Sequence, residues 1–391
     1  MWWSISPGRW WEESPMLDVH FDASHAVFRE KVRSFVAREI LPFVDDWEKD
    51  KTFPRELYAK AAREGFLGLG YPEACGGTPG DIFHEVVYTE EIIRCGSVGL
   101  ASSLGCCAIA LPPVLALGTP AQKNRFIPPV LKGEKIAVLG VTEPSGGSDV
   151  AHLQTTAERK QDHYVVNGSK IFITSGTRAD FVTTAVRTGG PGAGGISLLI
   201  IETNTPGFHA SGNFEKMGWH ASDTAELSFN NCEVPAENLL GEENKGFAGI
   251  MVNFQKERLL LALEAQTLAE MALEAAMQFI REHPEASGSQ SLRHRLAEMA
   301  TQVEAAKCFN YAAAAAIGRG ENVLKQVCMG KNFSTAVCSR VIDHALDILA
   351  YDGCLVNPFL ERLLRDSRVL SIGGGTYEIM NGVIAKQMGL R

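Results

Sequence analysis

Several features that would assign a function directly are missing from this sequence. No apolar run approaches the roughly 18 residues needed to cross a bilayer, so we expect no membrane span. The nine cysteines are an odd number, scattered without a Cys-x-x-Cys pair. They argue against a disulfide framework or a zinc ribbon and predict a reducing, cytoplasmic location. No Gly-x-Gly-x-x-Gly follows a predicted strand and no P-loop motif occurs, so neither common nucleotide site is supported.

The charge balance excludes a further group of functions. Lysine and arginine number 37 against 46 aspartates and glutamates, which gives a net charge of −9. Broad nucleic-acid binding needs a basic surface, so we expect no nucleic-acid partner. His84-Glu85 begins like the helix motif of zinc proteases, but Tyr88 stands where the second histidine belongs. We therefore predict no metal site.

The 391 residues predict two to three domains at roughly 150 residues each. Hydrophobic periodicity divides the chain into a helical N-terminal domain at 17–133, a β-rich middle domain at 134–241 and a helical C-terminal domain at 245–391. Residues 1–16 hold four of the six tryptophans among serine, proline and glycine. We expect a disordered extension there and a natural start at Met16.

The same periodicity predicts individual elements. The expected N-terminal helices run from Phe28 to Ile40, from Pro54 onward, over 82–93, over 98–117 and from Pro120 onward. In the middle domain, 163–174 is predicted to form a hairpin turning at Asn167-Gly168, with further strands at 181–186, 196–201 and 223–229. Long helices expected at 247–283, 290–317 and 322–350 suggest a four-helix bundle.

The helix expected over 247–283 carries an apolar stripe at i, i+3, i+4 and i+7 spacing. Glu257 and Arg258 interrupt this stripe, three and four residues after Phe254. No cation lies three or four positions from Glu257 and no carboxylate from Arg258, and adjacent residues do not face each other. A buried, unpaired carboxylate has a raised pKa, which suits a general base for a weakly acidic C–H group. Ordinary ion pairs to other helices would explain the same pattern.

Two glycine-containing loops join this helix as candidate site elements. Thr142-Glu-Pro-Ser-Gly-Gly-Ser-Asp149 offers hydroxyls and accessible N–H groups that can wrap a polar cofactor or a phosphate, although such a sequence is often only a turn. In Ser371-Ile-Gly-Gly-Gly-Thr-Tyr-Glu378, three glycines precede a threonine suited to cap a helix. The glycines allow either a close backbone approach to a ligand or a hinge.

Together these elements, in this order and spacing, resemble the acyl-CoA dehydrogenase family from about Leu17 onward. The motifs that carry the resemblance are Val141-Thr-Glu-Pro, Gly147-Ser-Asp, Phe172-Ile-Thr, Gly218-Trp with Ser222-Asp-Thr-Ala-Glu-Leu, Val234-Pro-Ala-Glu-Asn-Leu-Leu-Gly and Gly375-Thr. The resemblance implies a mostly α fold with a middle β-domain: an N-terminal helical domain, a small β-barrel and a C-terminal four-helix bundle.

The resemblance also implies a reaction, FAD-dependent α,β-dehydrogenation of an acyl-CoA thioester to a trans-2-enoyl-CoA. A base takes the α-proton and hydride passes to flavin N5. By position in the motifs, the expected cofactor-binding residues are Leu139, Val141, Thr142, Ser148, Phe172, Ile173, Thr174, Thr376 and Glu378. The expected substrate-binding residues are Ser148, Gln255, Arg258, Gly374 and Gly375. Phe172 replaces a tryptophan that is usual in the family, and Thr174 is expected near N5.

The position of the base distinguishes types within the family. Many members carry it directly before the Gly-Thr of the last motif, where this chain has Gly374 and therefore no base. Isovaleryl and long-chain types carry it on the long helix in a Glu-Arg pair followed by leucine, which matches Glu257-Arg258-Leu259. The helix-face argument and the resemblance thus both select Glu257 as the catalytic base. Arg258 is then expected to hold the CoA portion.

Two motifs depart from the family pattern. The Arg-x-x-Phe-Gly turn, which in the family reaches the FAD of a neighbouring subunit, is Arg281-Glu-His-Pro-Glu-Ala-Ser-Gly here. The Gln-x-x-Gly-Gly-x-Gly motif is Asp347-Ile-Leu-Ala-Tyr-Asp-Gly353, and an acidic Asp347 beside a diphosphate would need a nearby cation. A homo-oligomer, dimer or tetramer, and an electron-transferring flavoprotein partner are expected by resemblance. A flavin-dependent monooxygenase or oxidase, and an inactive FAD-binding scaffold, are the alternatives on this fold.

Overall fold

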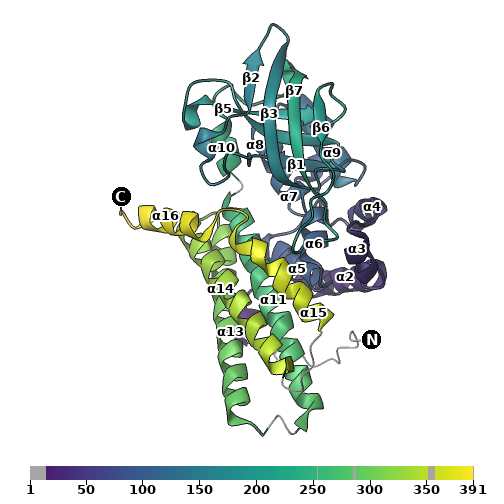
Figure 1. Ribbon diagram of the computed structural model, residues 1–391, viewed down its shortest axis with the longest axis vertical. Coiled ribbons are helices and arrows are strands. Elements are labelled where there is room, and N and C mark those ends of the chain that lie inside the picture. The colour runs from purple at the N-terminus through teal and green to yellow at the C-terminus, as the bar shows by residue number, and fades with distance from the viewer. Residues whose placement is uncertain (1–14, 253, 285–287, 351–356, 391) are drawn as a thin grey trace.

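The computed structural model describes residues 15–252, 254–284, 288–350 and 357–390. Figure 1 shows a sheet domain at one end of the molecule, a bundle of long helices at the other and the N-terminal helices beside them. One continuous core of buried apolar side chains runs through all three parts. The expected extension at 1–16 lies outside the described residues, except for Pro15 and Met16, which begin the first helix.

The N-terminal part is helical, as predicted. Its helices are α1 (Pro15–Asp18), α2 (Ala23–Glu39), α3 (Val44–Asp50), α4 (Glu56–Arg63), α5 (Ile82–Ile93), α6 (Val98–Leu104), α7 (Cys107–Ala110), α8 (Pro112–Leu117) and α9 (Pro120–Leu131). Polar side chains start several of them: Asp81 accepts the first free N–H groups of α5, and Thr119 does so for α9.

The single helix predicted over 98–117 is wrong, because the chain breaks there into α6, α7 and α8. Gly105 ends α6 and Pro112 opens α8, and both residues favour helix ends over helix interiors. Among the described residues, no single helix has both the length and the hydropathy to cross a membrane. Only the segments Val98–Leu104 and Cys107–Leu117, bent by 50° to each other, satisfy length and composition together.

The middle part is a single sheet. Its strands are β1 (Ala137–Gly140), β2 (Thr156–Arg159), β3 (His163–Thr174), β4 (Phe181–Arg187), β5 (Ile196–Glu202), β6 (Phe208–Ala210), β7 (Thr224–Pro235) and β8 (Leu239–Leu240). The order is β6-β7-β3-β2-β4-β5-β8, and β1 pairs with β4 in parallel. In the described chain the short outer strands β6 and β8 do not pair with each other, so the expected small barrel is an open sheet.

The predicted hairpin at Asn167-Gly168 is also wrong, because β3 continues through it as one strand. β7 pairs with β3 on both sides of this point, with a bulge between Val166 and Gly168. The Asn167 side chain accepts the N–H of Asn231 at 2.8 Å instead of turning the chain. Gly168 absorbs the bulge at a φ of 140°, where a Cβ would lie 2.7 Å from Thr155. A favourable turn dipeptide is therefore overridden by pairing along the whole strand.

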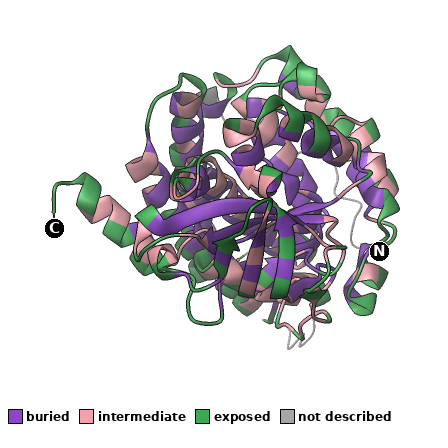
Figure 2. Ribbon diagram, turned by 90° about the horizontal axis from the view of Figure 1, so that it is seen from above, coloured by how far each residue is buried: buried purple, intermediate pink, exposed green. Residues whose placement is uncertain are grey.

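The C-terminal part is the helical bundle. Its helices are α10 (Gly246–Met251), α11 (Phe254–Glu282), α13 (Gln290–Gly318), α14 (Leu324–Leu349), α15 (Pro358–Ser367) and α16 (Tyr377–Gln387). The single helix predicted over 247–283 is thus two helices, α10 and α11. Helices α11, α13 and α14 pack against one another, and the shorter α15 lies against α11 and α14. In Figure 2, buried residues fill the centre and exposed ones the rim, while α16 extends outward to the C-terminus.

Candidate active site

Glu257 lies in the first turns of α11, at the end of the bundle that faces the sheet (Figure 1). Its side chain is half-buried, and no described residue donates a hydrogen bond to its carboxylate or pairs with it as an ion. The carboxylate faces the loop before α16: a Cβ built on Gly374 would lie 3.5 Å from Glu257 Oε1. Glu257 therefore lies next to position 374, where many members of the family that the sequence resembles carry a base.

Two buried cations hold this glycine loop in place. Lys331, on α14, donates to the carbonyls of Gly373 and Gly375, and the Arg258 Nε donates to the carbonyl of Gly374 at 3.3 Å. Lys331 is 1% and Arg258 is 5% exposed, so both charges are removed from solvent. Lys331 and Arg258 thus donate to the three consecutive carbonyls at 373–375 and not to the carboxylate of Glu257.

The electrostatics of this cluster suit proton abstraction. Burial raises the pKa of Glu257 above its ordinary value, although the charges of Arg258 and Lys331 oppose this rise. Burial lowers the pKa of Lys331 to about 8, against the pull of Glu257. A carboxylate with a raised pKa and no hydrogen-bonding partner is a stronger base than a solvated one.

A second buried ion pair supports the loop that the sequence predicted to line a cofactor. Lys170, on β3, is fully buried, and its Nζ donates to Glu143 Oε1 at 2.7 Å and to the Val141 carbonyl at 3.1 Å. Glu143 also accepts the N–H groups of Gln154 and Thr155, at 2.5 and 2.9 Å. The backbone on both sides of Thr142 is therefore anchored by buried contacts.

Phe172 is presented by a backbone irregularity next to this loop. The pairing of β3 with β7 shifts between Lys170 and Ile173, and Phe172 adopts a φ of 61° there. Its ring is 65% exposed, although Ile173 beside it is buried. The N–H of Ile171 donates to the Thr142 carbonyl at 2.9 Å, which joins the two segments. A left-handed backbone conformation at a phenylalanine costs free energy, so it persists only where the surrounding structure imposes it. Such conformations are common at ligand-binding sites.

Comparisons with known proteins agree with this architecture. The descriptions "Acyl-CoA dehydrogenase, N-terminal domain", "middle domain" and "C-terminal domain" match residues 22–134, 138–232 and 244–389. The chain belongs to the acyl-CoA dehydrogenase family. It is 36% identical to an acyl-CoA dehydrogenase of Bacillus subtilis over 95% of this chain and 99% of that protein.

Two further relatives extend the comparison. The crystal structure of a probable acyl-CoA dehydrogenase from Mycobacterium abscessus superposes with a TM-score of 0.92 at 47% identity, over 95% of this chain and all of that one. A subunit of the caffeyl-CoA reductase–Etf complex of Acetobacterium woodii is 31% identical over 94% of this chain and 98% of its own length. The predicted fold class is confirmed in its helical N-terminal and C-terminal domains and its middle β-domain, which is an open sheet in place of the small barrel. The chain is a flavoprotein-family oxidoreductase whose reaction class is acyl-CoA dehydrogenation.

The other residues predicted for the site of this acyl-CoA dehydrogenase have structural contacts or lie at the surface. Thr376 caps α16 by accepting the N–H of Ile379 at 3.3 Å, as the sequence predicted. Both polar atoms of the Gln255 side chain contact the backbone between α13 and α14, at Glu321 and Val323. Leu139 and Thr174 are half-buried, and Ser148 and Glu378 are exposed. The site roles of these residues stay predictions.

The family motifs that are altered in this chain are only partly described. Residues 285–287 and 351–356 lie outside the described residues, so part of each replacement motif does as well. Arg281 is exposed in the last turn of α11. Asp347 has the nearby cation that its place beside a diphosphate would need, because Arg295 Nη1 lies 3.4 Å from its carboxylate.

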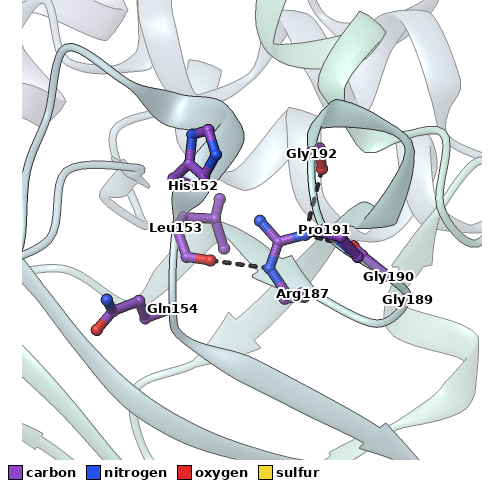
Figure 3. Close-up of a pocket in the computed structure, with 8 residues that line it drawn as sticks. All are labelled: His152, Leu153, Gln154, Arg187, Gly189, Gly190, Pro191 and Gly192. Atoms are coloured by element: carbon purple, nitrogen blue, oxygen red, sulfur yellow. Dashed lines mark hydrogen bonds between the residues drawn. The ribbon is translucent and has the colours of Figure 1, made fainter.

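One surface hollow lies in the middle domain and contains none of the candidate catalytic residues. It has a volume of about 460 Å³ and is lined only by middle-domain residues at 152–154, Arg187 and 189–192 (Figure 3). The guanidinium of Arg187 donates to the carbonyls of Ala151, Leu153, Gly190 and Gly192. Because these backbone carbonyls engage all three of its nitrogens, Arg187 fixes the loop rather than offering a free charge.

Sequence reasoning missed three groups that the fold brings together. Lys170 and Lys331 lie in unremarkable strand and helix patterns, and only burial reveals their roles. His25, Asp81 and His84 offer ligand atoms within 4.8 Å of one another. Each histidine completes a helix cap, of α2 or α5, and both contact the Asp81 carboxylate at 2.9 Å, which accounts for this cluster without a metal.

Proposed function

We propose that Glu257 is the general base that takes the α-proton of an acyl-CoA thioester, with FAD bound against the middle domain. The observation that carries this proposal is the half-buried carboxylate with its raised pKa, unpaired among the described residues and next to the glycine loop. The product is a trans-2-enoyl-CoA. Bound FAD supplies the hydride acceptor for the β-hydrogen.

The residues on the sheet side fit a flavin. A flavin needs an aromatic or apolar face and hydrogen-bonding groups at its polar edge. The exposed ring of Phe172 offers the face, and the hydroxyls of Thr142, Ser148 and Thr174 lie on the two segments joined through Ile171. Leu139, Val141 and Ile173 would complete the apolar lining, and Thr376 and Glu378 would contact the cofactor from the start of α16.

The glycine loop fits the thioester end of a substrate. In the described part of the chain, the N–H groups of Gly374 and Gly375 meet no acceptor, whereas the N–H of Gly373 donates to the Val369 carbonyl. Free N–H groups beside a base can polarise a carbonyl and stabilise the charge that forms when the α-proton leaves. Arg258 acts on this loop through its bond to the Gly374 carbonyl, and Gln255 lies on the same helix as Arg258. Ser148 would contact the substrate from the loop at 142–149.

The partners follow from the family and from the surface. The Acetobacterium woodii relative is named as part of a complex with an electron-transferring flavoprotein, and we propose such a partner as the electron acceptor here. Phe309 and Phe333 are 37% and 43% exposed on neighbouring helices of the bundle, and such an apolar pair fits a homo-oligomer contact.

Eight described cysteines carry free thiols, which fits a reducing, cytoplasmic location.

Anaerobic titration of the purified yellow protein with a panel of acyl-CoAs tests the proposal. Flavin absorbance near its visible maximum should fall with at least one thioester, and the matching enoyl-CoA should appear in equal amount. Oxygen uptake without enoyl-CoA would show an oxidase or monooxygenase instead. A protein that stays colourless after incubation with FAD would be the inactive scaffold.

A further inference from the structure

A second carboxylate shares the face of α11 that carries Glu257. Glu264 follows Glu257 by seven residues, close to two full turns, so both side chains leave the helix in nearly the same direction. Leu261 lies between them on this face, and its Cδ1 is 2.5 Å from a Cβ built on Gly374. The same apolar surface therefore connects the proposed base, the glycine loop and Glu264.

Glu264 lacks the partners that the other inward carboxylates of α11 have. Glu270 pairs with Arg94 and Lys307, and Glu274 pairs with Arg94. The Glu264 Oε2 atom is buried and has no hydrogen-bond partner among the described residues. Native proteins seldom leave such a group unsatisfied, so the Glu264 carboxyl has the capacity to meet one further hydrogen-bonding group.

The charge state of Glu264 indicates what kind of group it can meet. Burial, with the nearby charge of Glu257, raises the pKa of Glu264 to about 8. At neutral pH the side chain is therefore mostly a neutral acid, which donates one hydrogen bond and accepts others. Such a group favours an uncharged hydroxyl or amide over a carboxylate.

We infer that Glu264 recognises an uncharged hydrogen-bonding group, such as a hydroxyl or amide, on the acyl chain of the substrate. This inference rests on the proposed function, because the acyl chain reaches Glu264 only if its α-carbon lies at Glu257. The sheet lies beyond the start of α11 (Figure 1), so an acyl chain directed away from the sheet follows α11 towards Glu264. The helix rises about 10.5 Å between the two carboxylates, which places the recognised group several carbons beyond the thioester.

The test compares matched acyl-CoAs from hexanoyl to dodecanoyl, each as the plain alkyl chain and with a terminal hydroxyl, carboxamide, amine or carboxylate. At one chain length, wild-type kcat/KM should favour the hydroxyl or carboxamide over the alkyl chain by about tenfold, the worth of one net hydrogen bond. Glu264→Leu should remove this preference, whereas Glu264→Gln, which keeps a donor and an acceptor, should retain most of it. Glu282→Leu, at an exposed position of the same helix, is the matched control.

Several results would overturn the inference. One is a wild-type kcat/KM that is higher for the alkyl, amine or carboxylate chain than for the hydroxyl or carboxamide chain at every length. Another is a Glu264→Leu variant whose kcat/KM falls equally for alkyl and hydroxyl chains. Glu264→Met replaces the leucine variant if that protein does not retain flavin. Failure of the proposed function looks different, because then no thioester of any kind reduces the flavin of the wild-type protein.

Discussion

The buried pair beneath the cofactor loop gives a prediction whose size follows from the structure. Lys170→Met leaves the Glu143 carboxylate, 4% exposed, without its cation, although the N–H groups of Gln154 and Thr155 still donate to it. Glu143→Gln conversely leaves the fully buried Lys170 ammonium unpaired. Removing one partner of a buried pair costs about 3–5 kcal/mol of unfolding free energy. The double variant removes both charges, so it should cost at least about 2 kcal/mol less than the sum of the two single costs.

Urea unfolding of the flavin-loaded proteins at pH 7, followed by circular dichroism, measures these three differences. The same proteins should bind FAD more weakly, because Lys170 no longer fixes the Val141 carbonyl. Arg159→Met, which removes an exposed cation from neighbouring β2, should change stability by less than about 1 kcal/mol. If the costs of the single variants simply add in the double variant, the pair is not coupled and the reasoning is refuted.

Further predictions follow from the cluster around the glycine loop. Gly374→Ala places a methyl group 2.5 Å from Leu261 at a φ of 65°, so it should lower the free energy of unfolding in urea by more than about 1–2 kcal/mol. It should also lower the rate of flavin reduction about 10²-fold by displacing Glu257. Wild-type stability in this variant would contradict the geometry. Because Glu257 must be ionised and burial raises its pKa, the rate of flavin reduction should fall as pH is lowered through that raised pKa. Lys331→Met removes a charge that lowers the pKa of Glu257, so its stopped-flow pH–rate profile should shift to higher pH. An unshifted profile would disprove the coupling between Lys331 and Glu257. The neutral form of Glu264 stabilises the fold below pH about 4.5, and this stabilisation is lost as pH rises from there through about 8. Glu264→Gln should therefore flatten the loss of stability between about pH 5 and about pH 8; equal slopes for the two proteins would show that Glu264 is solvated.

Much of this architecture could be predicted from local sequence signals. The helix at 82–93 agrees with α5, and 290–317 agrees with α13 to within one residue, because a polar cap marks the start of each helix and a 3.6-residue period runs along it. The three-part fold followed from the change of period along the chain. These signals act over a few neighbouring residues, so no knowledge of distant contacts is needed.

The errors occur where distant contacts decide the structure. Asn167-Gly168 is a good turn dipeptide, yet pairing with β7 on both sides keeps β3 extended. Likewise, nothing near Lys331 in the sequence shows that its ammonium fixes the loop at 373–375 from a different helix. Glu257 could be selected because its helix face and its motif agree, whereas Glu264 lies on the same face without a motif and was not singled out.

Rapid mixing of wild-type and Glu257→Gln proteins with a reactive acyl-CoA under anaerobic conditions tests the central claim most directly. Glu282→Gln, at an exposed site of the same helix, serves as the control. Both variants should be yellow, and only Glu257→Gln should lose the single-turnover rate of flavin reduction, by at least about 10²-fold to 10⁴-fold. Flavin reduction by Glu257→Gln at the wild-type rate would contradict the assignment of Glu257 as the base.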